Sequence, residues 1–118
     1  MVHIAISVIP VKRDRVDEYK KMAKISAKLF MKHGAISYAE AFEDDVKPGK
    51  VTSFPQSVKL KEDEILAVAV ATFKTKKQHD LAWKTMMTEP FFASFDMKNA
   101  PFDLKRMYFG GFKSIVSV

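Results

Sequence analysis

Hydrophobic and polar positions change period several times along the chain, and each period predicts one kind of element. Residues 2–9 alternate and are rich in Val and Ile, which is typical of a half-buried β-strand. A helix should follow, with Asp14 as N-cap, Asp17 three residues later, and Gly34 at the C′ position that favours positive φ. The apolar residues at helical spacing in this segment are Val16, Tyr19, Met22, Ala23, Leu29 and Phe30.

Two further strands are predicted in the middle of the chain. Residues 35–43 have strand character, and residues 64–73 are an almost unbroken apolar run of strand length, which suits a buried strand. Residues 44–50 contain Pro and Gly and are typical of a turn. Residues 51–60 stay ambiguous, because Pro55 restricts them to an edge strand or an extended loop.

The C-terminal third repeats the helix-then-strand order. Residues 75–78 (Thr-Lys-Lys-Gln) form a capping-box pattern that starts a second helix, and Pro90 lies just past its end. Its expected inner face consists of Leu81, Ala82, Thr85 and Met86. Residues 91–100 indicate a short helical turn and loop. Residues 105–116 should form the last strand, in which the Gly pair 110–111 marks a bulge or a close backbone approach.

The order β-α-β-β-α-β predicts an α+β protein, a ferredoxin-like βαββαβ sandwich with an antiparallel sheet, as a single domain over residues 1–118. Such a sheet carries helices on one face only. Residues 65–71 are apolar on both faces, which a solvated face would not tolerate. We therefore expect a homodimer in which two copies pack sheet against sheet.

Composition excludes several classes of protein. With 47% hydrophobic and 29% charged residues, the chain has the balance of a globular domain, and the absence of cysteine excludes disulfides and thiolate metal sites. Residues 1–9 are apolar but lack a basic leader, so we expect no signal peptide. No segment approaches the ~20 apolar residues of a membrane span. We expect a cytoplasmic protein.

The net charge of +6 suits an anionic partner, although it also serves solubility alone. Four lysines at spacing four form one basic stripe on the first helix, and a solvated face explains them more simply than a partner does. These are Lys20, Lys24, Lys28 and Lys32. Residues 106–112 resemble the aromatic-basic strand motif of RNA-binding domains, but that motif belongs on the third strand and this stretch is the last. We expect no nucleic-acid partner.

Metal and cofactor sites are not expected. His3, His33 and His79 lie far apart in sequence, and none has a partner at metal-ligand spacing. The acidic triplets 43–45 and 62–64 lack the spacing of a calcium loop, and we interpret both as solvated turns.

Glu40 is the most informative single acid, because its neighbours on the second strand are mostly apolar. If it faces the open side of the sheet, the carboxylate is partly desolvated and could act as a general base or hold a cationic group. Alternatively, it points outward or pairs with Lys105 or Arg106. Asp103, Lys105 and Arg106 could themselves bind an anion, but a turn fixed by Asp103 pairing with one of the bases is the simpler interpretation.

A set of stretches in a fixed order and spacing resembles the YbaA-like family of small bacterial proteins, a domain of unknown function in the dimeric α/β-barrel superfamily. They are Leu29-Phe30, Gly34-Ala35, Asp44-Asp45-Val46, residues 49–54, Val58-Lys59, residues 84–87, Pro101-Phe102-Asp103, Lys105-Arg106-Met107 and Gly110-Gly111-Phe112. The resemblance implies the ferredoxin-like fold and a homodimer whose two sheets close into a barrel. It implies no activity, so no catalytic residue is transferred from it.

Three functions remain open from the sequence. The first is a homodimer that binds a small anionic or aromatic molecule between sheet and helices, through Glu40, Phe42, Lys105, Arg106 and Tyr108. The second is a cofactor-independent enzyme of monooxygenase or isomerase type, with Glu40 as base and Arg106 holding the developing oxyanion. The third is a structural dimer without a ligand pocket.

Overall fold

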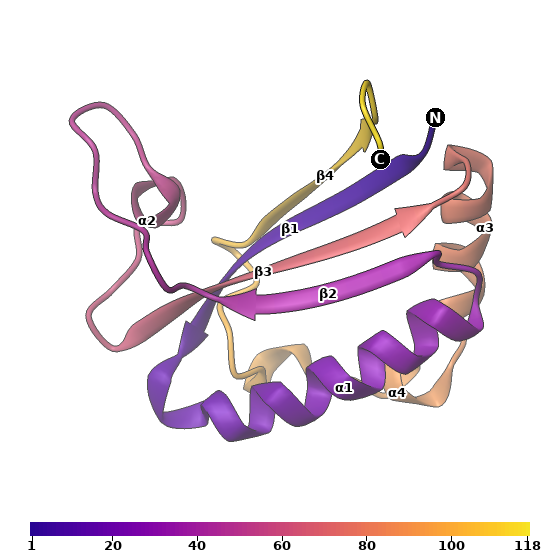
Figure 1. The fold of residues 1–118 in the computed structure, drawn as a ribbon. Helices are drawn as coiled ribbons and strands as arrows, with labels where there is room; N and C mark the ends of the chain where they lie inside the picture. The colour runs from indigo at the N-terminus through magenta and orange to yellow at the C-terminus, as the bar shows by residue number, and fades with distance from the viewer.

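The computed structural model describes residues 1–118, and it has one four-stranded antiparallel sheet in the order β2-β3-β1-β4 (Figure 1). The expected α+β architecture with the order β-α-β-β-α-β is confirmed, with four short helical segments in addition. The strands are β1 (His3–Lys12), β2 (Ser37–Phe42), β3 (Glu64–Phe73) and β4 (Tyr108–Lys113). The helices are η1 (Arg13–Arg15), α1 (Val16–Lys32), α2 (Phe54–Ser57), α3 (Lys76–Met86), α4 (Pro90–Ala93) and η2 (Met97–Asn99).

One face of the sheet is covered by α1 and α3 (Figure 1). The core on this side has two clusters of buried side chains, one below each half of the sheet. The first cluster contains Ile9, Val11, Tyr19 and Ala67. The second contains Ala35, Ala71, Phe73 and Ala82. Small strand residues at the centre of the sheet leave room for the aromatic side chains of the helices, so aromatic rings carry much of this packing.

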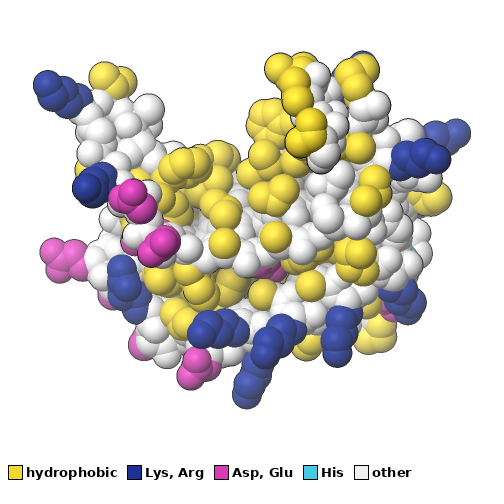
Figure 2. All heavy atoms as spheres, in the orientation of Figure 1, with side chains coloured by type: hydrophobic (Ala, Val, Ile, Leu, Met, Phe, Trp, Pro, Cys, Tyr) yellow, Lys and Arg dark blue, Asp and Glu magenta, His cyan; other side chains and the backbone are white.

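The opposite side of the sheet, called the open face below, has no long helix over it (Figure 1). The strand register places alternate residues there, such as the pairs Val8–Val68 and Ile6–Val70. At one end of this face the segment around α2 buries Val58 against Val8 and Leu66. The rest of the face is apolar and only partly buried, and Figure 2 shows hydrophobic side chains gathered in the hollow between two projections.

The first helix starts later than predicted. Asp14 lies within η1 and is not an N-cap, because α1 begins at Val16 with Arg15 at the capping position and no side-chain cap. Its end is predicted correctly, since Gly34 has a φ of 107°, in the region that favours glycine.

The second helix begins where the capping-box pattern predicts. The Thr75 hydroxyl accepts a hydrogen bond from the amide of Gln78 over 3.1 Å. Its inner face is only half as predicted: Ala82 and Met86 are buried, whereas Leu81 is 65% exposed. The helix turns the ridge of Ala82 and Met86 to the core, so the neighbouring ridge with Leu81 and Thr85 faces outward, toward the end of α1.

The ambiguous segment 51–60 is neither an edge strand nor an extended loop throughout, because it contains the single-turn helix α2. Ser53 is its N-cap: the Ser53 hydroxyl accepts from the backbone amide of Gln56 and donates to Oε1 of the Gln56 side chain. Pro55 fits at the first turn, where no amide donor is needed. The last strand begins at Tyr108, later than predicted, because backbone hydrogen bonds to the carbonyl of Asp103 hold a turn just before it.

The glycine pair of β4 marks a close approach, as predicted. A Cβ at Gly111 would lie 2.6 Å from Cε1 of His3, whereas one at Gly110 would meet nothing closer than 3.8 Å. The other alternative, a bulge, is excluded by the unbroken register from His3–Lys113 to Val8–Tyr108.

Candidate functional site

Glu40 lies at the centre of a hydrogen-bonded group between β2 and α1. The alternation of β2 turns Tyr38, Glu40 and Phe42 toward the helices, so Glu40 does not face the open side of the sheet. The hydroxyl of Tyr19 donates to Oε1 of Glu40 over 2.5 Å, and that of Tyr38 donates to Oε2 over 2.7 Å. The alternative in which Glu40 pairs with Lys105 or Arg106 is wrong, because its partners are these two tyrosines.

Aromatic rings surround this carboxylate. The ring of Tyr19 lies 5.8 Å from that of Phe42 and meets Phe102 edge-on at 6.0 Å. Phe30 stacks on Tyr38 with 4.5 Å between the ring centres. The group therefore combines one carboxylate acceptor with aromatic rings that pack around the two tyrosines.

The two tyrosines keep their protons. Burial, followed by the negative charge of Glu40, raises the pKa of both Tyr19 and Tyr38 far above the usual range of a phenol. Both hydroxyls therefore act as donors at any physiological pH. Each carboxylate oxygen has two lone pairs and receives one tyrosine, so Glu40 retains capacity to accept a further hydrogen bond on each oxygen.

The structure brings together only two of the five residues predicted for a pocket. Phe42 lies beside Glu40 on the helix-covered face. Tyr108 belongs to the other side, where its hydroxyl donates to Oγ of Ser57 in α2 over 2.9 Å. Lys105 is exposed, and Arg106 belongs to a separate ion-pair group. Tyr19 was missed by the sequence analysis, since its helical spacing marks it as a core residue like its neighbours.

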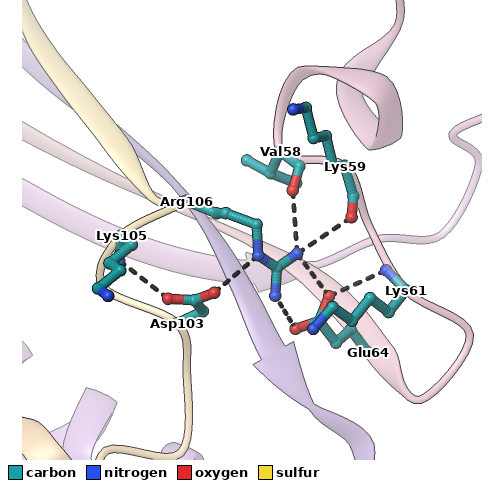
Figure 3. Close-up of polar contacts among 7 residues, drawn as sticks. All are labelled: Val58, Lys59, Lys61, Glu64, Asp103, Lys105 and Arg106. Atoms are coloured by element: carbon teal, nitrogen blue, oxygen red, sulfur yellow. Dashed lines mark hydrogen bonds and ion pairs between the residues drawn. The ribbon is translucent and has the colours of Figure 1, made fainter.

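Arg106 joins the turn before β4 to the start of β3 (Figure 3). Its guanidinium pairs with both carboxylate oxygens of Glu64 and donates from Nε to Asp103 over 2.7 Å. Nη1 also donates to the carbonyls of Val58 and Lys59, at 3.0 and 3.1 Å. The interpretation of Asp103 as the residue that fixes this turn is confirmed. Since two carboxylates and two carbonyls already surround Arg106, most of its donors are occupied and two negative charges offset its own, so it is poorly suited to hold an anion or an oxyanion.

Glu64 corrects the interpretation of residues 62–64 as a solvated turn, because it is only 4% exposed. The hydrogen bonds from Arg106 lower the pKa of Glu64 and, at the other side of the guanidinium, that of Asp103. Both carboxyls are therefore charged at neutral pH, and the three residues form a partly buried ion-pair network that ties two distant segments together.

The histidines occupy structural positions. Nε2 of His33 lies 3.0 Å from Oε2 of Glu89. The ring centres of His3 and His79 lie 4.8 Å apart, although the two residues are distant in sequence. Burial, and then the neighbouring His79, lower the pKa of His3. No group of three or more His, Cys, Asp or Glu side chains has an arrangement that could hold a metal ion.

The basic stripe of α1 lies on the surface. Its lysines are all exposed, and Figure 2 shows Lys and Arg side chains along the lower edge of the molecule, over α1. Lys32 pairs with Glu89 over 2.9 Å. None of the helices is long and apolar enough to cross a lipid bilayer.

A hollow of about 210 Å³ opens on the open face, between the sheet and the loop that carries α2. It is lined by Ala41, Phe42, Glu43, Asp44, Val46, Phe54, Leu66 and Val68. The lining is mostly apolar, and one of its two acids is already used, since Oε2 of Glu43 accepts from the amide of Leu66 over 2.6 Å.

Comparison with known proteins finds a family match along most of the chain. The model of a family described as "Protein of unknown function (DUF1428)" matches residues 2–104. The uncharacterized protein YbaA of Escherichia coli K12 is 38% identical over 109 residues, which is 92% of each chain. A YbaA protein of Shigella flexneri matches to the same extent.

Solved structures show the same fold at low sequence identity. A dimeric ferredoxin-like protein from an uncultured marine organism superposes with a TM-score of 0.58 and 9% identity, covering 99% of this chain and 98% of the other. A variant of SnoaB, a cofactor-independent oxygenase from Streptomyces nogalater, has a TM-score of 0.56 and 16% identity, with coverage of 98% and 96%. At these identities the likeness establishes the ferredoxin-like fold and nothing further.

Proposed function

The chain belongs to the DUF1428 family of proteins of unknown function, and we propose that it acts as a homodimer that binds a small uncharged aromatic molecule at Glu40. The observation that carries the proposal is the carboxylate of Glu40, which receives two tyrosine hydroxyls and still has a free lone pair on each oxygen. A ligand hydroxyl or N–H group would take one of these positions.

The open face supports the dimer. Its central side chains are apolar and only partly buried, so leaving them in water costs about 25 cal/mol for each Å² of apolar surface that a second copy would cover. The protein of similar fold from the marine organism is described as dimeric. Packing two open faces together would leave α1, and with it Glu40, on the outside of each subunit.

The walls and charge of the site define the ligand class. Phe42, Phe30 and Phe102 lie around the two tyrosines and offer flat apolar surface that suits an aromatic ring. No lysine or arginine pairs with the carboxylate of Glu40, so the site offers no positive charge to a ligand anion. Of the two ligand types expected from the sequence, the geometry therefore favours the aromatic one over the anionic one.

Proton transfer is a second candidate function, favoured by the same carboxylate. Glu40 would remove a proton from a bound carbon or oxygen acid and return it at another position, as an isomerase does. The two tyrosine hydroxyls would stabilise the negative charge on the deprotonated substrate. Arg106 cannot take this role because it is already paired with Glu64 and Asp103. SnoaB, which has a similar fold, is described as a cofactor-independent oxygenase.

Two measurements test the proposal. Native mass spectrometry of untagged protein should show a dimer, with any co-purified ligand as extra mass, and a monomer would contradict the dimer. Titration with phenol, followed by amide NMR, should shift the signals of residues 38–42, whereas benzoate of similar size should not. Glu40→Gln should weaken phenol binding at least tenfold, and Glu43→Gln serves as the matched control on the same strand end. Absence of phenol-induced shifts at millimolar concentration would contradict the binding site.

A further inference from the structure

The open face ends in a projection at each end, and both rise from the same side of the sheet (Figures 1 and 2). One is the loop that carries α2, at whose base lies the hollow of about 210 Å³. The other is the segment of residues 114–118, which follows β4. Both projections carry exposed apolar side chains, so each presents surface that water solvates poorly.

The segment 114–118 is anchored at its first residue only. The amide of Ser114 donates to the carbonyl of Val2 and its hydroxyl accepts from the amide of Val2, each over 2.9 Å. Beyond this anchor, Ile115 is 94% exposed and Val116 is 76% exposed. The anchor therefore holds two bare aliphatic side chains beside the open face without covering them.

The hollow presents a complementary surface at the opposite end. Its lining is mostly apolar, and Phe54 at its edge is 55% exposed. The α2 end of the face lies near Val8, whereas segment 114–118 is bound to Val2. About six residues of β1 separate the two, or roughly 20 Å at about 3.3 Å per residue. The segment cannot reach the hollow of its own chain.

We propose that the hollow is filled by the segment 114–118 of a second copy, with the partner subunit's Ile115 and Val116 against Phe54 and Val46. A twofold axis that lies between the two packed faces, parallel to them and at right angles to the line from the hollow to segment 114–118, exchanges these two sites, so the α2 loop of one copy comes opposite segment 114–118 of the other. Packed sheets lie about 10 Å apart, and projections of this kind can bridge such a gap. This arrangement rests on the proposed dimer and adds reciprocal contacts at both of its ends.

The absence of cysteine makes disulfide trapping a clean test. The double variant Phe54→Cys with Val116→Cys, oxidised at micromolar concentration, should give a covalent dimer as the main species on a non-reducing gel. The matched control pairs Phe54→Cys with Lys77→Cys, on the helix-covered side, and should remain uncrosslinked. Each single variant, Phe54→Cys or Val116→Cys, should not form a covalent dimer. In the proposed arrangement the two copies of Phe54 lie at opposite ends of the interface, and so do the two copies of Val116.

Failure of this inference can be told apart from failure of the dimer. If native mass spectrometry shows a dimer but the double variant crosslinks no faster than its control, the placement of segment 114–118 is wrong and the dimer stands. If the protein is monomeric, both are overturned. As an independent check, Val116→Asp should weaken dimerisation at least tenfold while leaving the circular dichroism spectrum unchanged, and an unchanged dimer affinity would contradict the contact.

Discussion

The hydroxyl of Tyr19 in α1 donates to Oε1 of Glu40 in β2 over 2.5 Å, and this bond crosses from the first helix to an edge strand of the sheet. Tyr19 is only 5% exposed, so its hydroxyl has little access to water as an alternative partner. The pair therefore both holds the helix to the sheet and keeps a carboxylate inside an aromatic environment.

Replacing Tyr19 with Phe should destabilise the fold by about 1.5–3 kcal/mol, because the change removes one of two donors to a carboxylate and keeps the ring. Urea unfolding, monitored by circular dichroism, measures the effect. Tyr108→Phe is the matched control, since that hydroxyl bonds to Ser57 on the surface, and it should change stability by less than about 0.5 kcal/mol. If both variants lose the same unfolding free energy, the hydrogen bond to Glu40 stabilises the fold no more than a surface hydrogen bond does.

Replacing Arg106 with Met should cost about 3–5 kcal/mol, because Glu64 would then be a buried carboxylate without its cation. Lys105→Met, which alters the adjacent exposed base, should stay within about 0.5 kcal/mol. Adding Glu64→Gln to the Arg106 variant should recover part of the loss, since the uncompensated charge is removed. A double variant that is less stable than Arg106→Met alone would refute this explanation.

The stability of the protein should fall on acidification, in part through the same network. Hydrogen bonds from Arg106 depress the folded-state pKa of Glu64 and Asp103, so the unfolded chain binds more protons. Their contribution is complete above the unfolded pKa values, about 4 for both residue types, and is lost as the pH falls through the lower folded values. Unfolding free energies measured from pH 6 to 2.5 should decline below about pH 4. The decline should be shallower in Arg106→Met, where only the other paired carboxylates contribute, and an unchanged slope would contradict the assignment.

Gly111→Ala should destabilise the fold by about 1–3 kcal/mol, because the new Cβ would lie 2.6 Å from the ring of His3. Gly110→Ala changes the neighbouring residue of the same strand, where the nearest atom is 3.8 Å away, and should cost less. Thermal unfolding compares the two. Combining Gly111→Ala with His3→Ala should cost less than the sum of the two single changes, and strict additivity would rule out the clash.

If the proposed dimer forms through the open face, Val70→Lys should give a monomer, because it places a charge at the centre of that face. Light scattering coupled to size-exclusion chromatography measures the mass in solution. Lys28→Glu, a charge change on the exposed stripe of α1, should leave the dimer intact. If the Val70 variant remains dimeric, the subunits associate through another surface and the barrel arrangement is wrong.

Elements whose signal is local could be predicted from the sequence. The strand β3 has the predicted bounds, since an apolar run of strand length between turns needs no distant partner to be recognised. Gly34 and Thr75 occupy their predicted end positions for the same reason, because caps depend on neighbouring residues. Ser53 and Pro55 also carry a local signal, since Ser suits an N-cap and Pro suits the first turn of a helix. Pro55 equally disfavours a strand, and the prediction for residues 51–60 rested on that effect alone, so it missed α2.

The composition of the site depended on contacts between distant segments, which local patterns do not encode. Glu40 could be selected as an isolated acid on a strand, but the face it takes depends on the pairing register, and a shift of one residue would reverse it. Tyr19 becomes its partner only because α1 packs across β2. In the same way, Arg106 pairs not only with its neighbour Asp103 but also with Glu64, forty-two positions away, which no local pattern indicates. The sequence thus determined the elements and their order, while long-range packing alone decided which polar side chains meet, because their distances are set by the assembled sheet.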